Sequence, residues 1–123
     1  MLTLYIIPIE GKNIKLLIKS FEGIDCNIVR FRTNIDFNKK SFTKWKMFMY
    51  AGEYLSDELR KAIPIFLEHD EFDAFKIYRK GNNGYSISPR IFKSGVVLPK
   101  NSLLPMDDCK MEIILNGFIL END

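Results

Sequence analysis

The sequence predicts a single α+β domain over residues 1–123, with a mixed or largely antiparallel sheet of about five to six strands and two helices packed on one face. Three observations support this fold class. Short β-branched and aromatic segments recur between Gly, Asn and Pro turns. Two segments carry apolar residues at helical spacing. The length suits one domain, and no repeat or linker divides it.

The N-terminal third predicts strand, helix and strand. Leu2 to Ile9 forms an apolar strand, and Pro8 places its end near a sheet edge. An amphipathic helix follows from Asn13, a capping residue, to about Gly23. Asp25 to Thr33 is a second strand. The apolar stripe of the helix, expected in the core, comprises Ile14, Leu17, Ile18 and Phe21.

Residues 41–50 fit two structures. Lys44 and Lys46 alternate with Trp45, Met47 and Met49, which favours a strand, whereas Phe42, Trp45 and Met49 also fit one face of a helix. The β-rich composition favours the strand.

The next helix begins at Ser56, which can cap it, and Pro64 inside it should kink or divide it. Its core-facing residues would be Leu59, Ile63 and Phe66. The strands 72–80 and 85–92 should form a hairpin, because the Gly-Asn-Asn-Gly turn between them tolerates positive φ. Pro89 makes the second of these an edge or short strand. A short strand at 96–98, a loop at 99–105 and a second hairpin, 110–115 with 118–120, complete the chain.

Charge alternates in blocks along the chain, although the net charge is only +2. Residues 11–46 carry nine bases and three acids, and residues 47–75 carry two bases and seven acids. Residues 76–100 carry six bases and no acid, and residues 101–123 carry one base and five acids. Such local fields steer binding partners and do not perform chemistry.

Nothing in the sequence predicts an enzyme, a cofactor or a metal site. His69 is the single histidine, and its acidic neighbours match no ordered metal motif. No serine has glycine on both sides, and the glycine turn precedes a strand, so neither a nucleophile nor a phosphate loop is evident. Cys26 and Cys109 are expected to be free thiols. The apolar N-terminal run has no basic residues before it and no small-residue cleavage site after it, so it is a poor signal peptide, and it is too short to span a membrane. These features predict a cytoplasmic protein without a membrane partner.

Two surfaces are candidates for binding. Cations interleave with aromatic residues on two segments, a pattern that suits single-stranded nucleic acid. The acidic segment after the second helix could instead enter the basic cleft of a toxic nuclease. The nucleic-acid residues would be Lys44, Trp45, Lys46, Arg79, Lys80 and Tyr85, and the protein-binding residues would be Glu68, Asp70, Glu71, Phe72 and Asp73.

In its size, its lack of catalytic motifs and its Lys-, Asn- and Ile-rich usage, the chain resembles a small bacterial immunity protein of a toxin–immunity pair. The resemblance implies tight, stoichiometric inhibition of a cognate toxin. The alternatives are a small single-stranded nucleic-acid-binding protein, a phage-encoded inhibitor of a bacterial defence system, and a structural or regulatory subunit of a larger assembly. The sequence names neither the partner nor the oligomeric state.

Overall fold

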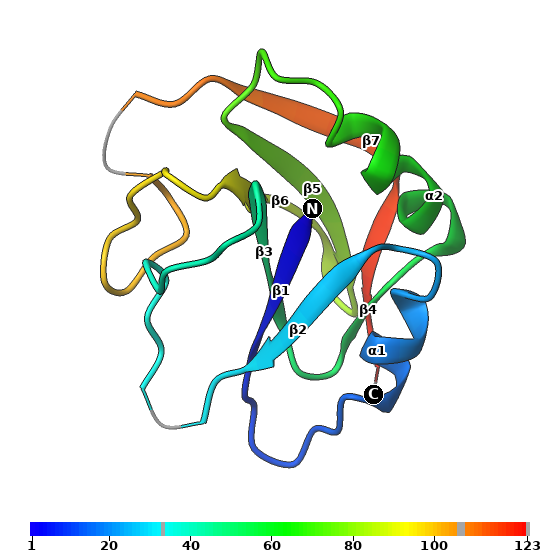
Figure 1. The fold of residues 1–123 in the computed structure, drawn as a ribbon. Helices are drawn as coiled ribbons and strands as arrows, with labels where there is room; N and C mark the ends of the chain where they lie inside the picture. Colours follow the sequence, from blue (N-terminus) through cyan, green and yellow to red (C-terminus); the bar gives the residue numbers. More distant parts are fainter. Residues whose placement is uncertain (33, 106–107, 123) are drawn as a thin grey trace.

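The computed structural model describes residues 1–32, 34–105 and 108–122. These residues form seven strands, which make one mixed sheet curled into a half-barrel, and two short helices (Figure 1). The strand order is β2-β1-β3-β6-β5-β7-β4. In chain order the elements are β1 (Leu2–Ile7), α1 (Lys15–Ser20), β2 (Cys26–Arg30), β3 (Trp45–Tyr50), β4 (Glu53–Leu55), α2 (Asp57–Phe66), β5 (Ala74–Gly81), β6 (Gly84–Lys93) and β7 (Met111–Glu121).

The predicted fold class is wrong in its balance of strand and helix. Only 13% of the chain is helical, and the sheet has more strands than predicted. The helices do not form a layer over one face: α1 packs against β4 and α2 packs against β7, both at one end of the strand order. Neither helix in the described residues is long and apolar enough to cross a membrane.

The first strand lies inside the sheet. β1 pairs in parallel with both β2 and β3, and all six of its residues are buried. A parallel strand with both faces covered favours such a continuous apolar run. Pro8 therefore does not mark a sheet edge, because the strand ends at Ile7 before it. Thr33, the predicted end of the second strand, lies outside the described residues.

Two apolar cores lie on opposite faces of the sheet. The larger core lies inside the curl and includes Leu17, Phe21, Leu59 and Ile63, as predicted, with Ile14 and Phe66 packed partly buried against it. Ile18 is instead 40% exposed, so the buried side of α1 is narrower than the predicted stripe. The second core lies under the long loops that precede β3 and follow β6, on the side away from the helices (Figure 1), and includes Phe37, Phe48 and Leu98.

Residues 45–50 are a strand, as the alternation favoured. Trp45, Met47 and Met49 join the core inside the curl, and Phe48 joins the second core. The predicted hairpin is confirmed by β5 and β6, which pair from Gly81 and Gly84 outward. β6 is neither short nor at an edge, since it lies between β3 and β5. Pro89 is accommodated beside the register shift between Phe75 and Lys76, where the ladder is interrupted.

The C-terminal half differs most from prediction. Residues 96–98 form no strand, and Glu53–Leu55 form the unpredicted strand β4. The second hairpin is wrong, because β7 runs without a turn through Gly117, whose φ is 87°. A strand that bends at one glycine can shift its register, and β7 does so against β5 between Ile77 and Arg79. Pro64 likewise does not divide α2, which continues to Phe66.

Ser56 fixes the start of α2, as predicted, and also joins it to β7. Its hydroxyl accepts hydrogen bonds from the backbone N–H of Leu59 at 3.2 Å and of Phe118 at 3.0 Å. Ser56→Ala should therefore lower the free energy of unfolding by about 1–2 kcal/mol, since a lost N-cap alone costs about 1 kcal/mol. Urea denaturation measures this, with exposed Ser86→Ala as the control. Equal effects from both variants would contradict the role of the cap.

Candidate functional site

The acidic segment predicted to bind a protein forms the connection from α2 to β5. Glu68, Asp70 and Glu71 are exposed, and Phe72 and Asp73 are half-buried. In Figure 1 this connection, drawn in bright green, rises beside β7. The helix ends at Phe66, and backbone bonds from Leu67, Glu68 and His69 to the last turn of α2 keep the chain close to it.

Basic residues from the rest of the sheet hold this segment in place. The Lys44 ammonium pairs with the carboxylate of Asp70, and Lys93 donates to the Asp70 carbonyl at 2.5 Å. Asp73 accepts from the backbone N–H of Lys110 at 3.0 Å. Two of the predicted carboxylates are thus used within the fold. Glu68 and Glu71 keep exposed carboxylates, and that of Glu71 lies 3.3 Å from the His69 ring.

An open hollow of about 490 Å³ lies between this segment and β7. Glu71 and Phe72 belong to one wall of it, and Glu112, Ile113 and Leu115 form the other. Leu115 is 72% exposed, a large value for an apolar residue. The hollow therefore combines apolar contact area with carboxylates, and its remaining lining residues are Phe66 and His69.

The β7 residues of this hollow were missed by sequence reasoning. Residues 111–115 were predicted as strand, but the continuation of β7 to Glu121 and its neighbours were not, because strand order depends on contacts between distant segments. The alternation of Glu112 with Ile113 and Leu115 was the available signal. It shows a strand with one charged position and does not show what lies opposite.

The basic segment of β3 does not present a nucleic-acid surface. Trp45 is fully buried, and its indole N–H donates to the Leu67 carbonyl at 3.0 Å. Lys46 is 2% exposed, and its ammonium donates to the carbonyls of Phe37 and Val96 at 3.2 and 2.9 Å. Burial lowers the pKa of Lys46, although the charge of Asp36 opposes this. A nucleobase cannot stack on the Trp45 indole, because that ring is inside the core.

The candidate nucleic-acid-binding residues on the β5–β6 hairpin do not all lie together either. Lys80 and Tyr85 do come together, with the ammonium 6.0 Å from the ring centre and Tyr85 64% exposed. Arg79 is adjacent in sequence, but its guanidinium contacts Glu53 at 2.6 Å and Glu121 at 3.2 Å. The six residues therefore do not form one continuous basic and aromatic surface.

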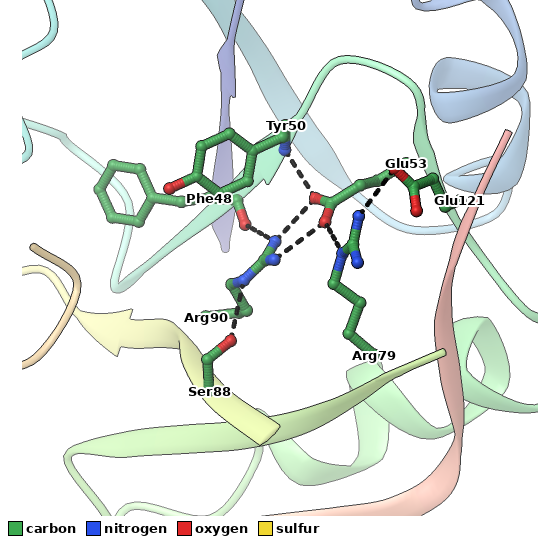
Figure 2. Close-up of polar contacts among 7 residues, drawn as sticks. All are labelled: Phe48, Tyr50, Glu53, Arg79, Ser88, Arg90 and Glu121. Atoms are coloured by element: carbon green, nitrogen blue, oxygen red, sulfur yellow. Dashed lines mark hydrogen bonds and ion pairs between the residues drawn. The ribbon is translucent and has the colours of Figure 1, made fainter. Parts of the chain in front are cut away.

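Glu53 is the centre of a buried ion network that the sequence did not predict (Figure 2). Its carboxylate is only 2% exposed and accepts two hydrogen bonds from Arg90, at 2.8 and 2.9 Å. It also accepts from Arg79 and from the backbone N–H of Tyr50, at 2.6 and 2.7 Å. Arg90 extends the network to the Phe48 carbonyl at 3.2 Å. The network therefore joins β3, β4, β5 and β6.

The pKa of Glu53 reflects opposing effects. Burial by itself raises the pKa, but the hydrogen bonds and charge of Arg90, with the bonds from Tyr50 and Arg79, outweigh burial and hold it below its usual value. Glu53 is thus a stable carboxylate, not a proton donor near neutral pH. A neighbouring hollow of about 310 Å³ is also lined by Lys12, Gly52 and Glu121. Because the buried charges of the network already pair with each other, we assign it a structural role.

In the part of the chain that the structure describes, no group of three His, Cys, Asp or Glu side chains could hold a metal ion. Cys26 and Cys109 are both free, as predicted. They lie against different cores, on opposite faces of the sheet. Burial raises the pKa of both thiols, and nearby Asp25 and Asp73 add to the effect, so neither is activated as a nucleophile.

Comparison with known proteins identifies a similar fold but no family. No protein-family model and no curated protein matches the chain. Among solved structures, the chain is similar to the crystal structure of S. aureus TarS 1-349, with a TM-score of 0.66 and 12% sequence identity. The alignment covers 99% of this chain and 60% of the TarS chain, so this chain spans less than two thirds of that protein. At this identity the likeness concerns the fold alone.

Proposed function

We propose that this chain is a non-catalytic inhibitor of the immunity type, which acts in the cytoplasm by binding a cognate toxin, with a nuclease as the leading candidate. One observation carries the proposal: the acidic segment borders an open hollow whose walls are partly apolar. Carboxylates steer a basic partner, and apolar area at the centre of an interface supplies most of the affinity. The hollow offers both in one place.

The segment is also held in place before a partner arrives. Asp70 and Asp73 are tied to Lys44, to Lys93 and to the backbone of Lys110. A loop that is already ordered loses less conformational entropy on binding, which raises affinity. Glu68 and Glu71 remain as the carboxylates that a basic cleft would meet, whereas Asp70 is partly neutralised by its lysine.

The proposal predicts that reversing these two charges slows association. In Glu68→Lys/Glu71→Lys, the association rate constant with the captured toxin should fall about tenfold or more at low salt, because electrostatic steering raises association rates by 10–10³-fold. Affinity purification from the native host would identify the toxin, and surface plasmon resonance would give both rate constants. The free energy of unfolding should change by less than about 1 kcal/mol, since exposed charges contribute little.

Glu10→Lys/Glu22→Lys is the matched control. It makes the same change in net charge at two exposed residues outside the acidic segment, Glu10 in the turn after β1 and Glu22 just after α1. It should leave the association rate nearly unchanged. If both double variants slow association equally, the association rate depends on net charge alone and the acidic segment is not the binding site. If a toxin is captured and the Glu68/Glu71 variant binds it with unchanged rate constants, the interface lies elsewhere, and if no toxin is captured the inhibitor proposal fails.

A further inference from the structure

The first half of β7 is an open sheet edge. β7 pairs with β5 on one side from Met111 onward, but β4 covers its other side only at Ile119, Leu120 and Glu121. Among the described residues, no strand pairs with the outer side of Met111–Leu115. Unpaired strand edges are templates for another extended chain, and native proteins usually block them.

The hydrogen bonds of this edge show how it is blocked. In a strand, successive residues direct their backbone groups to alternate sides. The Lys110 carbonyl accepts from the backbone N–H of Asp73 and Ala74, so Lys110 directs its backbone groups toward β5, and by this alternation Ile113 directs its own to the outer side. There the Ile113 N–H bonds to the side-chain carboxylate of Glu112 at 2.9 Å. This bond is exposed and joins adjacent residues, so rotation of the Glu112 side chain would release the N–H to a partner chain.

The hollow follows this edge. Residues from both faces of β7 line it, Glu112 from one face and Ile113 and Leu115 from the other. A lining from both faces places the hollow at the edge of β7 and not over one face of the sheet. Its far wall carries Phe72 and Glu71 from the acidic segment.

We propose that an extended, basic segment of the protein partner adds to β7 at Met111–Leu115 as a further strand. Its backbone would take the N–H of Ile113, its basic side chains would face Glu71 and Glu112, and its apolar side chains would pack on Leu115 and Phe72. Such strand addition obtains affinity from main-chain bonds and specificity from alternate side chains. A second copy of this chain fits poorly, because it would bring the acidic edges together.

This inference rests on the proposed function and states the chemistry of the partner. It can be tested on the full chain with short fluorescent peptides. The first alternates valine with lysine, the second alternates valine with glutamate, and the third is the lysine peptide with alternate backbone nitrogens methylated. The lysine peptide should bind at least about tenfold more tightly than the other two at low salt. On its binding, hydrogen exchange at the Ile113 amide should slow.

The methylated peptide separates strand addition from charge attraction, because it keeps the charge and loses the backbone donors. If it binds as tightly as the unmethylated peptide, strand addition is wrong. Leu115→Lys should weaken the lysine peptide at least about tenfold, because lysine on an edge opposes pairing and repels the probe. Val97→Lys, at a residue 56% exposed on a loop, is the matched control and should bind normally. Equal binding by both variants would also overturn the inference.

The two proposals fail separately. If a captured toxin binds Leu115→Lys and the unaltered protein equally well but responds to reversal of Glu68 and Glu71, strand addition is wrong and the inhibitor stands. If the lysine peptide protects Ile113 but no toxin is captured, the edge site stands and the immunity function is wrong.

Discussion

Glu53→Ala is expected to lower the free energy of unfolding by about 3–5 kcal/mol, because removing one partner of a buried ion pair leaves the other uncompensated. Here the change leaves Arg90, which is 4% exposed, without its carboxylate. It also removes the acceptor of the Tyr50 N–H and one carboxylate partner of Arg79. Denaturation in urea at pH 7 measures the loss. Glu22→Ala, at an exposed position, should change stability by less than about 1 kcal/mol.

The contribution of Glu53 should depend on pH in a defined direction. Its pKa is lower in the folded protein than in the unfolded chain, where a glutamate has a pKa of about 4.3. The stabilisation is therefore fully present above that value and is lost as the pH falls through the lower, folded-state pKa. The difference in unfolding free energy between the unaltered protein and Glu53→Ala should be constant from about pH 6 to 8 and should shrink below about pH 4. A difference that grows in acid would contradict this assignment.

Local elements were predictable because their signals lie within a few residues. The Gly-Asn-Asn-Gly turn fixes the β5–β6 hairpin through its own backbone preferences. Ser56 caps α2 through the nearby Leu59 N–H. In contrast, the second hairpin was predicted from Asn116-Gly117, a pair that often makes a turn. Gly117 instead bends one long strand, and the choice between the two depends on α2, which packs against that point.

The site was less predictable than the elements, because its residues meet across long sequence separations. Glu53 stood in an acidic block with nothing to distinguish it, and its partners Arg79 and Arg90 come 26 and 37 residues later. Lys46 was predicted as a nucleic-acid-binding residue, since it is a cation that alternates with Trp45 and Met47. Loops cover its face of β3 with a second core, so its ammonium is buried against carbonyl groups. A period of two identifies the two faces of a strand but does not show whether both are covered.

The bend in β7 at Gly117 predicts the second large loss of stability. Gly117→Ala is expected to lower the free energy of unfolding by about 2–6 kcal/mol, the sum of backbone strain and overpacking. The φ of 87° at Gly117 is rarely adopted by residues with a side chain. A Cβ there would also lie 2.6 Å from the Leu59 backbone nitrogen and would collide with the Ser56 hydroxyl, the group that caps α2.

Gly23→Ala is the control that separates these two causes. Gly23 has a similar φ of 88°, but a Cβ there would meet nothing within 4 Å, so only the strain remains. Its expected cost is about 1–3 kcal/mol. Urea denaturation should therefore give a lower free energy of unfolding for Gly117→Ala than for Gly23→Ala. In addition, Ser56→Ala combined with Gly117→Ala should cost less than the two changes made separately, because the alanine at 56 removes the hydroxyl that obstructs the new methyl group. Equal losses from the two glycine variants would show that β7 and α2 can separate at this contact without penalty, and that the close approach at Gly117 does not hold the helix against the strand.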